Sequence, residues 1–176
     1  MRCFTPVCKK APGFCAPAVM ADNSVAEVSL EDERGRYVVL IFYPGDFSFV
    51  CPLELTAFNR KLPEFTRRGA VLWAISGDSV YSHLAWKRLP PDEGGAGGIG
   101  YPMLEDRNGE IARDFGVRLS PALNMRGLFI IDRSGIVRHS TVNDLFLCRS
   151  AAETLRVLDA LIFYESGGRV CTDGIG

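Results

Sequence analysis

A cysteine at the start of a predicted helix is the residue of this sequence best placed for chemistry. Cys51 follows an apolar run at residues 38–42 and precedes Pro52, which favours the first turn of a helix. Unpaired backbone N–H groups and the positive end of the helix dipole stabilise a thiolate at such a position. We therefore expect the Cys51 thiol to be nucleophilic.

Three neighbours of Cys51 have side chains that can support a thiolate. Ser48 lies three residues earlier and can place a hydroxyl beside the sulfur, and Pro44 can form a wall of the pocket. Glu54 lies about one helical turn later, where its carboxylate can hold an arginine through a charge-assisted hydrogen bond. Such groups matter because donors around a nucleophile stabilise the charge that develops during reaction.

The surrounding pattern predicts a strand, a loop and a helix that together present Cys51. Val38–Phe42 is a continuous β-branched and aromatic run, typical of a strand buried on both faces of a parallel sheet. Apolar residues then recur at three- and four-residue intervals from Leu55 to Phe65, which predicts one helix. A buried strand at residues 71–76, followed by a helix capped by Asp78 or Ser79, completes a βαβ unit around Cys51.

The rest of the chain predicts shorter elements around this unit. Residues 25–30 alternate as an edge strand does, and residues 125–132 form an apolar strand that turns back at residues 134–135. Ser150 and Glu153 predict a capping box for a helix that ends near Glu165. Further predictions are a short helix at 108–115, a returning strand at 136–141, and a mobile or tightly turned loop at 90–100.

The composition is that of one globular domain. The chain has 176 residues, of which 47% are hydrophobic and 23% are charged. Its net charge of −1 gives no electrostatic footprint for nucleic acid, and no apolar run approaches the roughly 18 residues of a transmembrane helix. We expect no nucleic-acid partner and no membrane partner. Because no hydrophobic signal segment is visible, we expect a cytoplasmic protein.

Six cysteines and two histidines raise the alternatives of a disulfide scaffold and a metal site. No Cys-x-x-Cys pair occurs, which argues against a zinc knuckle and against a thioredoxin-type dithiol. We therefore expect no metal and no cofactor. Cys3, Cys8 and Cys15 lie in or near a basic N-terminal arm, where we assign them no role. A regulatory disulfide and a fragment of a targeting peptide remain alternatives for this arm.

The segment around Cys51 resembles the peroxidatic motif of the typical two-cysteine peroxiredoxins, thiol peroxidases of the thioredoxin superfamily. The matching string is Phe42-Tyr43-Pro44-x-Asp46-Phe47-Ser48-Phe49-Val50-Cys51-Pro52-x-Glu54. Gly45 stands where the family usually has Leu, and Ser48 where it usually has Thr, so the hydroxyl is retained. A lone cysteine is more often an inert buried thiol, but the matching positions favour a reactive Cys51.

Other segments extend the resemblance over about residues 11–171. Arg126, in the string Arg-Gly-Leu-Phe-Ile-Ile-Asp, matches the family's substrate-binding arginine, and Arg149 matches a second arginine near the pocket. Cys171 lies in a segment that resembles the one bearing the resolving cysteine, although Thr172 replaces the usual proline. Two departures lie near the arginines: Met125 replaces an aromatic residue and Cys148, for which we expect a structural role, replaces a glycine.

The resemblance implies an α/β, thioredoxin-like fold with a central mixed β-sheet flanked by helices. It divides the chain into an N-terminal arm (1–10), a peroxiredoxin domain (11–165) and a C-terminal segment with the resolving cysteine (166–176). It implies reduction of hydrogen peroxide and alkyl hydroperoxides through a Cys51 sulfenic acid, which forms an intersubunit disulfide with Cys171. A thioredoxin-like dithiol protein would recycle this disulfide. The implied assembly is a homodimer, five of which can form a decamer.

Two other functions are alternatives at this stage. A holdase chaperone or redox relay would bind proteins, and a peroxide-consumption assay with a thiol reductant separates it from a peroxidase. A thioredoxin-like disulfide reductase would need the Cys-x-x-Cys pair that the sequence lacks. Gly97–Gly100 resembles the glycine motif of hyperoxidation-sensitive peroxiredoxins, but five residues follow Cys171, too few for a covering helix. From that short tail we expect rapid disulfide formation and low hyperoxidation.

Overall fold

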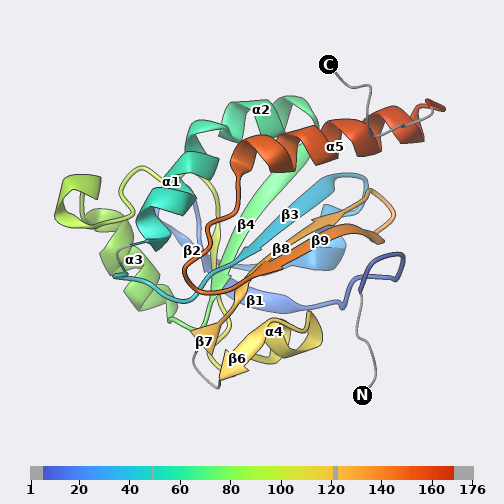
Figure 1. Cartoon of the computed structure of the whole chain (residues 1–176). Helices are drawn as coiled ribbons and strands as arrows, with labels where there is room; N and C mark the ends of the chain where they lie inside the picture. Colours follow the sequence, from blue (N-terminus) through green and yellow to red (C-terminus); the bar gives the residue numbers. More distant parts are fainter. Residues whose placement is uncertain (1–5, 49, 121–122, 169–176) are drawn as a thin grey trace.

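One mixed seven-stranded sheet forms the centre of the molecule, in the order β2-β1-β5-β4-β3-β8-β9 (Figure 1). The structure, a computed structural model, describes residues 6–48, 50–120 and 123–168. β3 pairs in parallel with β4, and β4 with β5, whereas the other neighbours are antiparallel. The predicted α/β fold with a central mixed sheet flanked by helices is therefore confirmed.

The elements follow one another along the chain with short connections. The strands of the sheet are β1 (Cys15–Val19), β2 (Val25–Ser29), β3 (Tyr37–Phe42), β4 (Ala70–Ser76), β5 (Met103–Glu105), β8 (Arg126–Ile131) and β9 (Val137–Asn143). A separate ribbon consists of β6 (Arg118–Ser120) and β7 (Leu123–Asn124). The helices are α1 (Cys51–Arg60), α2 (Leu62–Arg67), α3 (Val80–Arg88), α4 (Glu110–Asp114) and α5 (Ala151–Glu165), with 3₁₀ turns η1 (Leu30–Glu33) and η2 (Pro91–Glu93).

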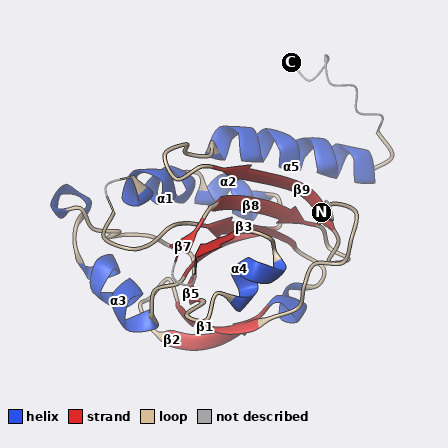
Figure 2. Ribbon diagram, turned by 60° about the horizontal axis from the view of Figure 1, so that its bottom comes forward, coloured by secondary structure: helices blue, strands red, loops and turns tan. Residues whose placement is uncertain are grey.

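Alternating side chains of β3 supply two separate hydrophobic cores. Val39 and Ile41 pack with residues of α1, α2 and α5 on one face, while Leu40 and Phe42 pack with residues of α4 on the other. Figure 2 shows α4 and α5 on opposite sides of the twisted sheet. Every residue of β3 is buried, as predicted for a strand covered on both faces. This rigid central strand leads directly into the loop before Cys51.

The single helix predicted after Cys51 is wrong, because the chain forms two helices. α1 ends at Arg60, Lys61 has φ −94° and ψ 0°, and α2 begins at Leu62. Pro63 explains the interruption: it has no N–H to donate, and its ring would clash with the carbonyl four residues earlier in a continuous helix. Phe58 and Phe65 still reach the same core with stacked rings 6.2 Å apart, so the apolar spacing reports a shared face.

Four short strands, β1, β5, β6 and β7, were not predicted from the sequence. β1 is interrupted in its pattern by Pro17, and β5 has only three residues, so neither carries a clear periodic signal. The remaining elements lie near their predicted places, with the predicted edge strand forming β2. Ser79, not Asp78, caps α3 by accepting a hydrogen bond from the Ser82 N–H.

Both ends of α5 are defined by local interactions. Ser150 accepts a hydrogen bond from the Glu153 N–H, whereas the Glu153 carboxylate pairs with Arg156 and not with the Ser150 backbone, so half of the predicted capping box forms. At the other end Gly167 has φ +90° and donates to Tyr164 O, and Gly168 donates to Phe163 O. This is a Schellman motif, which requires a residue in the left-handed region.

Candidate active site

Cys51 is the first residue of α1 and lies at the carboxyl end of β3. Six residue pairs in register hold β3 parallel to β4, so α1 and α2 form the crossover between them. Pro52 lies in the first turn of α1, as predicted. The Cys51 side chain is fully buried within the core that packs against α1. The thiol therefore lies in a water-poor environment at a helix N-terminus.

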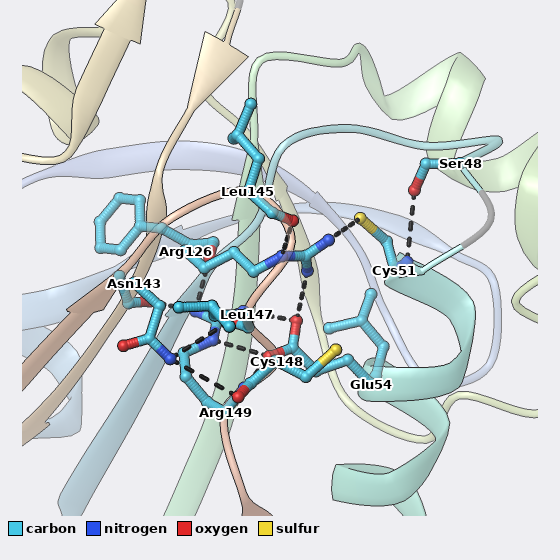
Figure 3. Close-up of polar contacts among 12 residues, drawn as sticks. Ser48, Cys51, Glu54, Arg126, Asn143, Leu145, Leu147, Cys148 and Arg149 are labelled. Carbon is cyan, nitrogen blue, oxygen red and sulfur yellow. Dashed lines mark hydrogen bonds and ion pairs between the residues drawn. The ribbon is translucent and has the colours of Figure 1, made fainter.

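Arg126 brings a positive charge to the buried sulfur. Its Nη2 donates to Cys51 Sγ over 3.6 Å, its Nη1 donates to Glu54 Oε2 over 2.6 Å, and its Nε donates to Leu145 O over 2.6 Å (Figure 3). Burial lowers the pKa of Arg126, but the charges of Cys51 and Glu54 outweigh it and hold the pKa above its usual value. The guanidinium is therefore charged and stabilises negative charge on the sulfur.

Glu54 is the hub of the arginine pair. Its two carboxylate oxygens accept hydrogen bonds from Arg126 and from three nitrogens of Arg149, including the backbone N–H of that residue. Burial raises the pKa of Glu54, but the hydrogen bonds and charge of Arg149 and the charge of Arg126 outweigh it, so the pKa lies below its usual value. The sequence predicted one arginine held by Glu54, and the structure shows two.

Arg149 also joins the site to the end of the sheet. Its Nη1 donates to Phe42 O over 2.6 Å and to Gly127 O, so one guanidinium binds the last residue of β3 and the second residue of β8. A planar guanidinium with several donors suits this arrangement better than an ammonium group would. The two strands that frame the site are thereby tied to Glu54 in α1.

Ser48 and Pro44 lie in the loop between β3 and α1. The Ser48 hydroxyl donates to Gly45 O and accepts a hydrogen bond from the Cys51 N–H, each over 3.3 Å. It therefore acts in the observed conformation as a cap for the first turn of α1. Pro44 is half-buried directly after Tyr43. The predicted role of Pro44 as a pocket wall stays a prediction.

The formal charges of the site balance when Cys51 is a thiolate. A thiolate and the Glu54 carboxylate contribute two negative charges, and Arg126 and Arg149 contribute two positive charges. Burying a charge in a protein interior is costly unless an opposite charge pairs with it, and in this cluster every charge has an opposite partner. The arrangement therefore favours a nucleophilic sulfur beside a guanidinium. Cys171, the predicted resolving residue, lies outside the described residues.

Comparison with known proteins places this geometry in a family. A model of the AhpC/TSA protein family matches residues 7–140. The chain belongs to this family of peroxiredoxins. It is 49% identical over 164 residues to a thioredoxin peroxidase of Echinococcus granulosus, covering 93% of this chain and 84% of that protein. It is 48% identical to peroxiredoxin prdx-2 of Caenorhabditis elegans, covering 94% and 83% of the two chains.

A solved structure shows the same fold in a relative. The reduced 2-Cys peroxiredoxin of Plasmodium vivax superposes with a TM-score of 0.94 at 43% identity, over 97% of this chain and 89% of that chain. This likeness confirms the thioredoxin-like peroxiredoxin fold and the recognition of the chain as a two-cysteine peroxiredoxin. It covers both the strand that precedes Cys51 and the strand that carries Arg126.

A buried polar network beside the site was not predicted from the sequence of this peroxiredoxin. Asp46 Oδ2 lies 2.9 Å from His83 Nδ1 and accepts a hydrogen bond from the Ser82 hydroxyl, while Asp46 Oδ1 accepts one from the Tyr43 hydroxyl. Asp78 Oδ2 accepts from the Asp46 N–H. The loop before Cys51 is thus fastened to α3. His83 and Trp86 are fully buried.

The glycine-rich loop is tightly turned and held against two helices. Asn59 of α1 donates to Gly98 O and accepts from the Gly100 N–H, each over 2.8 Å. The Trp86 indole donates to Gly94 O over 2.9 Å. A Cβ atom at Gly95 would lie 2.0 Å from Leu89 O, so no larger residue fits there. Of the two predictions for this loop, the tightly turned one describes these contacts.

The other described cysteines do not share the environment of Cys51. Cys8, Cys15 and Cys148 are exposed free thiols. The Cys15 thiol donates to the Glu27 carboxylate over 3.0 Å, and this hydrogen bond raises the pKa of Cys15, which disfavours its thiolate. Among the described side chains no cluster of three or more His, Cys, Asp or Glu could hold a metal ion. In the same part of the chain, no helix has the length and apolar character needed to cross a bilayer.

Proposed function

We propose that this peroxiredoxin reduces hydroperoxides at Cys51, with Arg126 as the group that binds the peroxide. The observation that carries the proposal is the position of the Arg126 guanidinium. A guanidinium has five N–H donors, and the three described hydrogen bonds of Arg126 engage Leu145, Glu54 and Cys51. Donors therefore remain on the two terminal nitrogens, one of which already faces the sulfur.

The reaction transfers one oxygen atom to sulfur. The Cys51 thiolate attacks the terminal oxygen of the hydroperoxide, an S–O bond forms and the O–O bond breaks. The leaving alkoxide or hydroxide takes up a proton and departs as alcohol or water, and Cys51 becomes a sulfenic acid. Arg126 stabilises the negative charge that moves from sulfur to the leaving oxygen, which is where electrostatic catalysis is most effective.

The other predicted site residues support these two groups. Glu54 and Arg149 hold Arg126 in place, since both arginines share the Glu54 carboxylate. Ser48 aligns the first turn of α1 and, by rotation of its hydroxyl, can also donate to the bound peroxide. Pro44 shields the sulfur from solvent. The hydrogen bonds of Glu54, Arg149 and Ser48 and the charge balance of the site support the roles of these three residues.

A chain-length argument supports resolution of the sulfenic acid by Cys171 of a second subunit. α5 begins beside Arg149 and has 15 residues, which is about 22 Å at 1.5 Å per residue. Two residues lie between Gly168 and Cys171, and three residue steps span at most about 10 Å. Figures 1 and 2 show α1 and the end of α5 at opposite sides of the molecule. This arrangement supports Cys51 of a second subunit as the target of Cys171.

The second half of the cycle then takes place between subunits. The Cys171 thiolate attacks the Cys51 sulfur of the partner copy, a disulfide forms, and the hydroxyl group leaves as water. A thioredoxin-like dithiol protein supplies two electrons that return both thiols. β9 lies at the edge of the sheet. Its first residue, Val137, bonds to the backbone of Cys8 and Lys9, but beyond it the described residues place no second strand beside β9, so the rest of β9 offers a strand edge to a second copy. We propose a homodimer, and a decamer as the higher assembly.

Names of relatives support the substrate class. Relatives of this chain include the thioredoxin peroxidase mentioned above and an alkyl hydroperoxide reductase C of Helicobacter pylori, which is 43% identical. We propose hydrogen peroxide and small alkyl hydroperoxides as substrates, and the cytoplasm as the compartment, because recycling requires a reducing environment. A relative from Bos taurus carries a mitochondrial name, so cell fractionation is the test of location.

A peroxide-consumption assay with a dithiol reductant tests the proposed function. Wild type should consume peroxide catalytically, and Cys51→Ser should abolish turnover. Cys15→Ser and Cys148→Ser are matched controls, since both residues are exposed thiols away from Arg126 contacts, and they should keep wild-type rates. Retention of activity in Cys51→Ser would refute the proposal.

A further inference from the structure

Two large apolar side chains stand exposed beside the reactive site, in the segment that joins β9 to α5. Phe146 is 83% exposed and Leu147 is 61% exposed. The backbone of the pair is held in place, because Asn143 Nδ2 donates to Leu147 O over 3.1 Å. Single exposed apolar residues are ordinary on a protein surface. The position of this pair, more than its exposure, therefore calls for an explanation.

Both ends of the segment bind the groups that hold the reactive sulfur. The Leu145 carbonyl accepts a hydrogen bond from Arg126 Nε over 2.6 Å, and the Arg149 N–H donates to Glu54 Oε1 over 2.6 Å. Through its other end the same Arg126 guanidinium donates to Cys51 Sγ (Figure 3). The exposed pair is thus suspended between the two arginines of the site, one residue away from the carbonyl that Arg126 binds.

The direction of the proposed attack places the organic group of a hydroperoxide on the side of Arg126. In a hydroperoxide ROOH the sulfur attacks the terminal oxygen, and the oxygen that carries R leaves. Displacement is in line, so the leaving oxygen points away from Cys51 and toward the Arg126 donors that stabilise its charge. Because R is bonded to this oxygen, R begins next to Arg126 and hence next to Leu145.

A long R group must then continue to the surface. Cys51 is fully buried and Arg126 is only 2% exposed, so the head of the substrate is enclosed by protein. Along the segment that is bonded to Arg126, the first exposed apolar side chains are those of Phe146 and Leu147. An alkyl chain that lies on them removes apolar area from water on both partners, which favours binding in proportion to the area covered.

We infer that Phe146 and Leu147 form an apolar rim that binds the alkyl tail of long-chain hydroperoxides, such as the hydroperoxides of fatty acids. The inference rests on the proposed function of Cys51 and Arg126, and it extends the substrate class beyond hydrogen peroxide and small alkyl hydroperoxides. The reaction is the same oxygen transfer: an S–O bond forms, the O–O bond breaks, and the leaving oxygen takes up a proton and departs as a long-chain alcohol.

The rim determines specificity and is not catalytic, because it touches neither the sulfur nor the O–O bond. Hydrogen peroxide has no tail and is therefore indifferent to it. An alkyl chain also suits the size of the rim better than a second protein chain does. Two side chains offer far less area than the roughly 800 Å² that each partner buries in a standard protein interface.

The test compares two substrates in wild type and in the double variant Phe146→Ser/Leu147→Ser. Stopped flow gives the second-order rate constants of Cys51 oxidation by hydrogen peroxide and by linoleic acid hydroperoxide, the latter below its critical micelle concentration. The ratio of the fatty-acid constant to the hydrogen peroxide constant should fall by about 10-fold in the variant, since an open rim covers only part of the tail. The hydrogen peroxide constant should stay at the wild-type value, which also shows that the variant is folded.

A short substrate and a matched variant make the result specific. The organic group of tert-butyl hydroperoxide is too short to reach the rim, so its rate constant should follow that of hydrogen peroxide. Tyr81→Ser is the control variant, because Tyr81 is 80% exposed but lies in α3, which packs on β1 and β5. It should change neither rate constant. An unchanged ratio in the double variant, or the same fall in Tyr81→Ser, would overturn the inference.

Hydrogen peroxide separates this inference from the proposed function. If neither peroxide oxidises Cys51 in wild type, the proposed function fails and the rim with it. If wild type reacts with hydrogen peroxide and the double variant keeps the wild-type ratio, the proposed function stands and the rim alone is refuted. Sedimentation velocity examines the other occupant. A changed assembly state in the double variant, with an unchanged ratio, would show that a second copy covers these side chains and would also refute the rim.

Discussion

Asp46 Oδ2 lies 2.9 Å from His83 Nδ1, and both side chains are fully buried. The contact joins the loop before Cys51 to α3, and two further hydroxyl groups, from Tyr43 and Ser82, donate to the same carboxylate. Asp46, which lies in the loop before Cys51, is therefore held by a polar cluster in which the central carboxylate and imidazole are both buried. The geometry of the nucleophile depends on this cluster as well as on the groups that touch the sulfur.

Substitution of Asp46 by Ala should loosen the loop and leave buried donors unpaired. We expect the free energy of unfolding to fall by at least about 1–3 kcal/mol, the usual cost of leaving a buried hydrogen-bonding group without its partner. The rate of Cys51 oxidation should also fall, since Ser48 and Cys51 would no longer be held in register. Urea denaturation and single-turnover oxidation measure the two effects. A variant with reduced stability but a wild-type oxidation rate would show that the cluster serves stability alone.

Glu54→Gln should lower stability in a pH-dependent way. The pKa of Glu54 is lower in the folded protein than usual, so its contribution to stability is present above the unfolded pKa of about 4.3 and is lost as pH falls toward the folded value. The difference in unfolding free energy between wild type and Glu54→Gln should be largest near pH 7 and narrow below about pH 4.

Chemical denaturation across this pH range measures that difference. Glu153→Gln is the matched control, because Glu153 is exposed and its carboxylate pairs with Arg156 on the helix surface. It should change stability little at any pH. A Glu54→Gln difference that did not vary with pH would contradict the assignment of Glu54 as an ionised partner of both arginines.

Arg126→Lys should reduce the second-order rate of Cys51 oxidation by about 100-fold or more, the usual cost of removing a donor to developing charge. A lysine cannot reach Leu145, Glu54 and the sulfur at once, whereas the Arg126 guanidinium bonds to all three. Arg138→Lys, at a half-exposed pair with Asp132, is the control and should react at the wild-type rate. Competition kinetics with a second peroxide-consuming enzyme provides the measurement.

Asn124→Leu should stabilise the protein by about 1 kcal/mol. Asn124 is only 2% exposed, and its Nδ2 has no hydrogen-bond partner among the described atoms. Leucine has a similar size and no polar group to leave unpaired. Asn143→Leu is the control, since Asn143 Nδ2 donates to Leu147 O and its loss should give no gain. Thermal unfolding compares the two. A lower midpoint for Asn124→Leu would show that the amide has a partner that matters.

Local patterns predicted the elements that carry the site. The apolar run of β3, Pro52 in the first turn of α1 and the spacing from Cys51 to Glu54 are all short-range signals, and each corresponds to an observed feature. Pro63 was available as a signal for the break between α1 and α2, but the regular apolar spacing on both sides outweighed it in the prediction.

Long-range partners were harder to predict. The contact of Asp46 with His83 joins residues 37 apart in the chain, and no local rule relates a loop carboxylate to a helix histidine. The same holds for Arg149, whose bonds to Glu54 span 95 residues. Arg126 and Arg149 entered the predicted site through resemblance to a family, since an arginine before a strand is by itself more often a surface residue. Strands as short as β5 lack enough residues for a periodic signal.

Cys51 and its arginines lie far apart in the sequence, and this has a consequence for the protein during its synthesis. Arg126 follows Cys51 by 75 residues, and Arg149 follows Glu54 by 95. At about 5–20 residues per second, a ribosome makes the first of these stretches in roughly 4–15 s. Throughout that interval the nascent chain carries Cys51 as an ordinary thiol with no guanidinium beside it. Chemical reactivity of the cysteine is therefore acquired only when most of the domain has emerged and folded, which protects unfinished chains from oxidation.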